Sequence, residues 1–170
     1  MAHAHPETPS PWVVRWAPLV TRGPVLDVAC GSGRHARIFG RFEVIAVDRE
    51  PQSIPGAQFV QADLEDGSPW PFEGQQFGAI VVTNYLYRPL LPVLAGALAE
   101  GGLLIYETFM AGNERYGRPS NPNFLLKPGE LLQAFGALSV VAFEQGDTGK
   151  SVVQRVCAIR AAANGVRIPA

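Results

Sequence analysis

Two glycines separated by one residue follow an apolar run early in the chain, and a carboxylate lies inside that run. The stretch 25–36 reads VLDVACGSGRHA, with Asp27 four residues before Gly31 and with Gly33 close behind. Glycine lets the backbone turn tightly and brings peptide N–H groups close to a ligand. GSGRHA also fits the pattern G-x-G-x-x-G/A, which is typical of dinucleotide sites but weak evidence alone. A nucleotide-like ligand is therefore expected at this turn.

Two more carboxylates each end an apolar run that is typical of a strand. Asp48 closes FEVIAVD, where it can accept hydrogen bonds from ribose hydroxyls, and Asp63 closes QFVQAD, where it can accept one from an adenine amino group. Dinucleotides and S-adenosylmethionine both contain a ribose and an adenine. Asp27 distinguishes between these two candidates, because a carboxylate beside the turn repels a pyrophosphate and attracts an ammonium next to a sulfonium. With 170 residues and no room for the substrate domain usual in dehydrogenases, the sequence favours S-adenosylmethionine.

Polar residues at the ends of the fourth and fifth expected strands are the candidates for catalysis. Asn84 ends GAIVVTN and is followed by Tyr85, and Glu107 lies near the end of LLIYETF. Methyl transfer needs an aligned nucleophile, exclusion of water and, for some acceptors, removal of a proton. A buried carboxylate is costly unless it is hydrogen-bonded, so Glu107 is interpreted as a general base, an anchor for a substrate ammonium or a brace for the next loop. Tyr85 either lines the path of the methyl group or caps the core.

These side chains need a sheet whose strands end at one edge. Five near-continuous apolar runs predict strands that are buried on both faces: residues 25–30, 42–48, 58–63, 78–84 and 103–109. Helices are expected between them, which predicts a parallel sheet covered on both faces. Two last runs, 138–145 and 151–161, alternate like strands around the turn 146–150, so one antiparallel strand is expected at the end.

The whole chain, residues 1–170, is expected to form one domain. Residues 1–22 are interpreted as a helical extension, because a serine–proline pair at Ser10 is a typical helix start. Residues 88–102 predict a helix closed by glycine. Residues 109–126 are rich in loop-forming residues and longer than most connections, which favours a lid over the substrate.

Composition and charge argue against several classes of protein. The net charge is −1, from 14 basic and 15 acidic residues, which argues against a dedicated nucleic-acid-binding protein. No stretch approaches the roughly 20 apolar residues of a membrane span, and the first residues lack the layout of a signal peptide, so a cytoplasmic protein is expected. Cys30 and Cys157 are expected to be reduced and buried, and His3 and His5 lie in a segment expected to be frayed, so no metal site is predicted.

Other charged and aromatic residues have two interpretations each. Trp70 and Phe72 flank the adenine or pack in the core. Arg34 and His35 approach the cofactor's carboxylate, or His35 lies on a helix surface. Arg88 is a solvated residue at a helix start or a substrate contact. Basic residues in and just after the lid indicate an anionic or carboxylate-bearing substrate, or else form a solvated surface: Arg115, Arg118 and Lys127.

From about Val25 to Arg160 the sequence resembles the class I S-adenosylmethionine-dependent methyltransferases. Their motif acid-x-G-x-G-x-G reads DVACGSG here, with Ala29 in place of the first glycine, and their LxPGG before strand five appears as LAEGG. The resemblance implies a Rossmann-like three-layer α/β sandwich with a mostly parallel seven-stranded sheet whose last strand is antiparallel. It also implies that the following residues bind S-adenosylmethionine: Asp27, Ala29, Gly31, Gly33, Asp48, Asp63, Leu64 and Asn84. More narrowly, TNYLYRPL and YETFMAGNERYGRPSNPNFLL are similar to small bacterial methyltransferases, some of them tellurite-resistance-like.

The resemblance implies an enzyme that methylates a small molecule, with Glu107, Tyr85 and Asn84 as catalytic candidates. Asn84 and Tyr85 occupy the place of the N-P-P-Y motif used on amino groups of bases or glutamine, but the prolines are missing, so that chemistry is not expected. A non-catalytic cofactor-binding module and an RNA or protein methyltransferase are the alternatives, and a nucleotide-dependent oxidoreductase comes last. The sequence does not indicate the acceptor atom or the oligomeric state.

Overall fold

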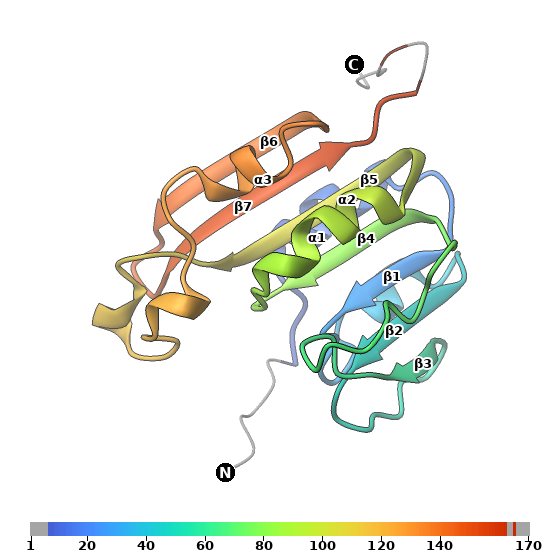
Figure 1. Cartoon of the computed structure of the whole chain (residues 1–170), viewed down its shortest axis with the longest axis horizontal. Helices are drawn as coiled ribbons and strands as arrows, with labels where there is room; N and C mark the ends of the chain where they lie inside the picture. The colour runs from blue at the N-terminus through green and yellow to red at the C-terminus, as the bar shows by residue number, and fades with distance from the viewer. Residues whose placement is uncertain (1–6, 163–164, 166–170) are drawn as a thin grey trace.

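A computed structural model describes residues 7–162 and residue 165, and these form a seven-stranded sheet with the order β3-β2-β1-β4-β5-β7-β6 (Figure 1). The strands are β1 (Val25–Val28), β2 (Val44–Asp48), β3 (Gln58–Gln61), β4 (Phe77–Thr83), β5 (Leu98–Phe109), β6 (Ser139–Asp147) and β7 (Val152–Ile159). Pairs among β1 to β5 are parallel, and β7 runs antiparallel to both β5 and β6. The predicted sheet, with the last strand antiparallel, is confirmed.

Burial follows the position of each strand in the sheet. Every residue of β1 (VLDV) and of β4 (FGAIVVT) is buried, as expected for apolar central strands with both faces covered. The edge strands β3 and β6 are largely exposed or half-buried. Because β1, β2, β4 and β5 are parallel, their carboxyl ends meet at one edge of the sheet.

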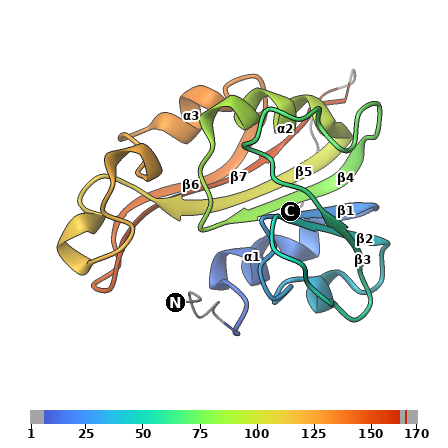
Figure 2. The same cartoon turned by 60° about the horizontal axis from the view of Figure 1, so that its bottom comes forward.

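Helical segments cover both faces of the sheet (Figure 2). The α-helices are α1 (Pro11–Trp16), α2 (Leu91–Ala97) and α3 (Glu130–Ala134), and the 3₁₀ turns are η1 (Ala17–Leu19), η2 (Ala36–Phe39), η3 (Arg88–Leu90), η4 (Asn113–Tyr116) and η5 (Pro122–Phe124). One apolar core contains residues of α2 and α3, and the other contains residues of α1, η1 and η2. Cys30 and Cys157 are free and buried in the second core, as predicted.

The sequence overestimated the helices between strands. Residues 49–57 and 62–76, all of them described, contain no helix. Each segment carries two prolines and at least one glycine, which remove backbone donors and favour turns. The first crossover has only η2, because three left-handed residues occupy its start.

The helix expected over residues 88–102 is also shorter than predicted. It ends at Ala97, and Leu98 already begins β5 opposite Phe77 of β4. Gly101 takes a positive φ of 74° and donates its N–H to the carbonyl of Arg160 over 2.8 Å. Backbone pairing with β4 and with Arg160 therefore overrides the local helical pattern of LAEGG.

Among the described residues, no helix combines the length and the apolar character that crossing a membrane requires. His3 and His5 lie outside the described residues.

Candidate functional site

The turn after β1 is built from three residues in left-handed backbone conformation. Ala29 has a φ of 50°, Gly31 of 54° and Gly33 of 74°. At Gly33 any side chain would also collide with Ile54, since a Cβ atom would lie 2.6 Å from its Cγ2. Ala29 stands where the resembling family has its first glycine and accepts the strained conformation with a small side chain. The turn therefore needs glycine at Gly33 on both conformational and steric grounds.

Asp48 fastens this turn to the end of β2. Its Oδ2 accepts the N–H of Gly31 over 2.9 Å, and its Oδ1 accepts the N–H of Glu50 over 3.0 Å. The predicted ribose-binding carboxylate thus lies directly beside the glycine turn. A carboxylate oxygen can accept more than one hydrogen bond, so both oxygens keep capacity for ligand hydroxyls.

Asp27 is a buried carboxyl group without a full set of partners. Its side chain is 2% exposed, and its Oδ2 has no hydrogen-bond partner among the described residues. Burial raises the pKa of Asp27 to about 8, against the lowering effect of Arg34 and with a smaller rise from Asp48. A buried carboxylate that lacks a partner is costly, and a bound ammonium would supply one. Asp27 therefore fits the cationic tail predicted from the sequence.

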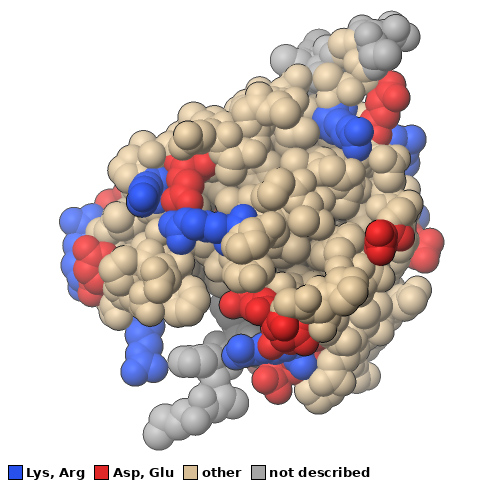
Figure 3. All heavy atoms as spheres, viewed as in Figure 1, with Lys and Arg blue, Asp and Glu red and all other residues tan. Residues whose placement is uncertain are grey.

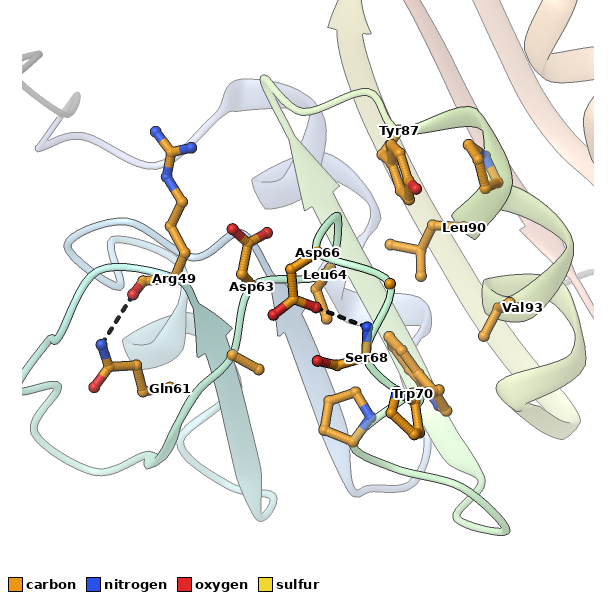
Figure 4. A pocket seen from close by; sticks show the side chains of 15 residues that line it. Arg49, Gln61, Asp63, Leu64, Asp66, Ser68, Trp70, Tyr87, Leu90 and Val93 are labelled. Atoms are coloured by element: carbon orange, nitrogen blue, oxygen red, sulfur yellow. Dashed lines mark hydrogen bonds between the residues drawn. The ribbon is translucent and has the colours of Figure 1, made fainter.

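Asp63 and Leu64 line a cavity of about 710 Å³, which lies within the usual range for small-molecule sites (Figure 4). Asp63 uses Oδ1 to accept the N–H of Glu65 over 2.9 Å. Trp70 and Tyr87 form other walls of the cavity. Phe72 is buried in the core and contacts Trp70 edge-on with 5.1 Å between ring centroids, so Trp70 alone of the two aromatic candidates faces this cavity. The cavity adjoins the carboxyl edge on the side of β3, and the glycine turn is outside its walls.

Asn84 and Tyr85 follow β4 at the same edge. Asn84 is exposed, has a φ of 55° and donates its N–H to the carbonyl of Glu107 over 2.9 Å. Tyr85 is half-buried and packs against the core, and burial, followed by the negative charge of Glu65, raises the pKa of its phenol. The two residues lie where the sequence placed them.

Glu107 is engaged at both carboxylate oxygens. It is 8% exposed, Oε1 accepts the hydroxyl of Ser10 over 2.7 Å, and Oε2 forms an ion pair with Arg155. The ion pair is a close contact whose atoms are not aligned as a hydrogen bond. Arg155 also contacts Glu144 at 3.2 Å. The sequence did not indicate Ser10 or Arg155 as partners of Glu107.

His35 and Arg34 both hold the segment that precedes α1. The expectation of a helix-surface histidine is wrong: His35 is 1% exposed, and its Nε2 accepts the N–H of Ser10 over 3.1 Å. Burial lowers the pKa of His35 to about 4, so the ring is neutral near pH 7. Arg34 donates to the carbonyl of Thr8 over 2.8 Å and to Oγ1 of Thr83 over 3.3 Å.

The expected lid, residues 109–126, is tied to β6 and β7 by side chains. Asn113 is 1% exposed, accepts the N–H of Val152 over 3.0 Å and donates to the carbonyl of Pro119 over 3.1 Å. Arg115 forms an ion pair with Asp147 at 2.7 Å. The basic charge of Arg115 is therefore already countered within the chain.

Arg88 holds the end of the segment 109–126 in place. Its guanidinium pairs with Glu130 at 2.6 and 3.1 Å and donates to the carbonyls of Asn123 and Leu125. Arg88 is the first residue of η3 and its side chain stays 38% exposed, but the guanidinium is held by these partners and is not free in solvent. A forked guanidinium that binds a carboxylate and two carbonyls is a structural joint between η3 and the segment leading into α3.

Metal ligands do not gather at this edge: within residues 7–162 and 165, no three His, Cys, Asp or Glu side chains form a group that could hold a metal ion.

Comparisons with known proteins add evidence at the level of fold. No protein-family model matches the sequence, and a comparison with curated proteins gives no match either. Among solved structures, the N-methyltransferase NodS from Bradyrhizobium japonicum WM9 matches with a TM-score of 0.64 and 15% identity, over 87% of this chain and 93% of that chain. TehB from Haemophilus influenzae matches with a TM-score of 0.69 and 14% identity, over 87% of this chain but 61% of that chain.

A third structure contains a bound cofactor product. Magnesium protoporphyrin IX methyltransferase from Synechocystis PCC 6803, with S-adenosylhomocysteine, matches with a TM-score of 0.63 and 15% identity over 88% of this chain and 79% of that chain. Identities this low establish the arrangement of the chain and not the reaction. The described chain therefore has the Rossmann-like α/β fold of these methyltransferases.

Proposed function

We propose that this chain is an S-adenosylmethionine-dependent methyltransferase that acts on a small molecule. The observation that carries the proposal is the buried carboxyl of Asp27, which lacks a partner at Oδ2 beside the turn at Gly31. That position calls for a cation and is unfavourable for a pyrophosphate. Solved structures with the same fold include methyltransferases with bound S-adenosylhomocysteine, which supports the same cofactor here.

Each residue at the strand ends would bind a different part of the cofactor. Asp27 would take the ammonium group, the turn from Ala29 to Gly33 would pack against the amino-acid tail, and Asp48 would accept the ribose hydroxyls. Asp63 and Leu64 would hold the adenine in the cavity that Trp70 also lines. When bound, the cofactor supplies an activated methyl carbon.

The chain contributes alignment and exclusion of water more than proton transfer. Both oxygens of Glu107 are engaged by Ser10 and Arg155, which supports a brace over a general base. Burial raises the pKa of Tyr85 further above that of an ordinary phenol, which does not favour Tyr85 as a general base. Asn84 is exposed beside these groups and can orient an acceptor by hydrogen bonds. Catalysis by positioning is consistent with an acceptor that attacks without losing a proton first.

The charge distribution supports a small acceptor. On the face shown in Figure 3, acidic and basic side chains lie in small mixed groups with wide uncharged areas between them. This pattern differs from the basic surface expected of a nucleic-acid-binding protein. Arg118 and Lys127 are exposed in and beside the segment 109–126, and they support an acceptor that carries a carboxylate or another anionic group.

Calorimetric titration with S-adenosylmethionine tests the proposal. We expect binding to the unmodified chain, at least about tenfold weaker binding to Asp27→Asn and Asp48→Asn, and no change in Glu43→Gln. Glu43 is exposed just before β2, at the opposite edge of the sheet, and so controls for loss of a negative charge. Unchanged affinity in Asp27→Asn, or no binding at all, would reject the assignment.

Turnover is tested separately by release of S-adenosylhomocysteine with a panel of small acceptors. Anionic acceptors are expected to react fastest. Tight cofactor binding without turnover on any acceptor would favour the non-catalytic module instead, and binding to RNA that weakens steeply with salt would favour a nucleic-acid substrate.

A further inference from the structure

One wall of the cavity assigned to the adenine is formed by η3, the residue before it and the first half of α2. Tyr87, Pro89, Leu90 and Val93 line the cavity from this side (Figure 4). Arg88 stands between two of these lining residues in the chain, but it is outside the lining itself. Whatever holds the Arg88 side chain therefore also limits how far this wall can move.

The Arg88 side chain is held by the stretch that leads from the segment 109–126 into α3. Its Nε and one terminal nitrogen donate to the two oxygens of Glu130 over 2.6 and 3.1 Å. Its terminal nitrogens also donate to the carbonyls of Asn123 and Leu125 over 2.9 and 3.0 Å. Exposed ion pairs usually contribute little, but a two-point pair between a guanidinium and a carboxylate is stronger and fixes a geometry. The side chain of Glu130 is only 16% exposed, so Arg88 is a firm attachment.

The base of the segment 109–126 lies at the same attachment. Leu126 donates its N–H to the carbonyl of Phe109 over 3.0 Å and accepts the N–H of Ala111 over 2.9 Å, so the two ends of the segment are paired. Leu126 is also buried in the same core as Leu90 of the cavity wall. Arg88 therefore joins the cavity wall to the base of the whole segment.

The charged contact at Arg115 differs from this attachment. Arg115 pairs with Asp147 of β6 at 2.7 Å, and the two side chains are 57% and 39% exposed. Strand β6 is at the opposite edge of the sheet from β3, beside which the cavity lies. Arg115 is thus an arginine of the same segment whose ion pair makes no link to the cavity wall, and it serves as a matched control.

Resting on the proposed function, we propose that Arg88 is a positioning residue that, acting through Glu130, holds the cavity wall and the segment 109–126 in one arrangement. A ligand that binds to a wall already held in place does not spend free energy on ordering it. Binding of the adenosine part of the cofactor and docking of the segment then favour each other, because both depend on the same guanidinium. Loss of this side chain leaves the wall and the base of the segment to be ordered when the ligand binds.

Calorimetric titration with S-adenosylhomocysteine measures this coupling without turnover. We expect Arg88→Gln to weaken binding at least about fivefold, the lower end of typical coupling between sites. Arg115→Gln removes the same charge from the same segment and should change the affinity less than about twofold. Equal weakening by the two variants would overturn the role of Arg88.

Action through Glu130 is tested by a double-mutant cycle in ligand affinity. Glu130→Gln should weaken S-adenosylhomocysteine by about the same factor as Arg88→Gln, and the double variant should lose no more than either single variant. Glu130→Gln keeps the Arg88 contacts to the two carbonyls, so it carries the test if Arg88→Gln fails to fold. Additive losses would contradict the proposal, because they would mean that the two side chains act independently on the ligand.

Hydrogen exchange gives a readout that loss of stability alone would not change. The N–H of Lys127 donates to Glu130 over 2.7 Å, and the N–H of Leu126 is bonded to Phe109, so both report docking of the segment base. S-Adenosylhomocysteine should slow exchange at both positions in the unmodified chain and in Arg115→Gln. It should not slow them in Arg88→Gln at saturating ligand, and equal slowing there would contradict the coupling.

The outcomes separate this inference from the proposed function. Unchanged affinity for S-adenosylhomocysteine in Arg88→Gln would overturn the positioning role and leave the methyltransferase proposal standing. Failure of the unmodified chain to bind S-adenosylhomocysteine would overturn both.

Discussion

The hydroxyl of Ser10 donates a hydrogen bond to Oε1 of Glu107 over 2.7 Å, although 97 residues separate the two in the chain. The same hydroxyl accepts the N–H of Trp12 over 3.1 Å and so caps α1. One oxygen atom thus starts a helix on one face of the sheet and holds a carboxylate at the end of β5. This hydrogen bond links the start of α1 to the end of β5, where Glu107 lies.

The coupling energy between Ser10 and Glu107 can be measured with a double-mutant cycle of Ser10→Ala and Glu107→Gln. Each single change should lower the free energy of unfolding by about 1–3 kcal/mol, because a buried partner loses a charged hydrogen bond. The double variant should lose less than the sum, with a coupling of about 1 kcal/mol in chemical denaturation. Strict additivity would show that the contact contributes nothing.

Glu107→Gln also separates a brace from a general base. A brace predicts a loss of stability and an unchanged shape of the pH–rate profile, since Arg155 and Ser10 lose their partner but no proton is transferred. A fall of 100-fold or more in kcat, about the size expected for a lost base, together with loss of the acidic limb of the profile would assign proton transfer to Glu107.

Asp27→Asn is expected to stabilise the ligand-free chain while weakening cofactor binding. The pKa of Asp27 is raised from 3.8 to about 8 in the folded chain, so this group's contribution to stability is full below about pH 4 and is lost as pH rises through 8. Each pKa unit corresponds to about 1.4 kcal/mol. The free energy of unfolding of Asp27→Asn should therefore exceed that of the unmodified chain by a few kcal/mol near pH 8, and the difference should vanish near pH 4. Thermal unfolding of both proteins from pH 4 to 9 measures it, and a less stable variant at pH 8 would contradict the burial argument.

Cofactor affinity should rise with pH below 8. The groups that act on the Asp27 carboxyl are Arg34 and Asp48, and Asp27 in turn acts on Cys30. Binding of an ammonium favours the ionised carboxylate, so a proton is released and affinity increases by up to about tenfold per pH unit between 6 and 8. The rise should stop near pH 8, where an α-ammonium itself begins to lose its proton. Calorimetry in two buffers of different ionisation enthalpy detects the release, and Asp27→Asn should show none.

Gly33→Ala should be far more costly than Gly74→Ala. Both glycines have similar positive φ values, 74° and 76°, but only Gly33 would bring a Cβ within 2.6 Å of Ile54, whereas Gly74 has open space. Gly74→Ala, the control, should lower the free energy of unfolding by about 1 kcal/mol from backbone strain alone. Gly33→Ala should lower it by about 1–3 kcal/mol more, because of the steric clash. Combining Gly33→Ala with Ile54→Val should recover part of the steric loss. Equal losses of stability in the two variants, measured by denaturant titration, would show that the turn or Ile54 moves enough to accommodate the added methyl group.

Strands were easier to predict than the segments between them. The apolar runs of β1, β2 and β4 are continuous because both faces are covered, and this pattern is visible in any window of the sequence. The end of α2 was misplaced because LAEGG suits a helix end locally, while pairing of Leu98 with Phe77 decides the structure. The local sequence does not reveal that His35 is buried, nor that its partner is Ser10, a residue from another part of the chain.

The order of carboxylates and glycines at successive strand ends can be read from the amino-acid sequence: Asp27, Gly31, Gly33, Asp48 and Asp63. Strand periodicity and left-handed turns are local properties, and the parallel sheet brings their ends to one edge. Which side chains meet at that edge follows from the tertiary structure, as with Ser10, Glu107 and Arg155. Such pairs depend on strand order and register, because a side chain's partner across the sheet is set by which strands are neighbours and not by the residues around it.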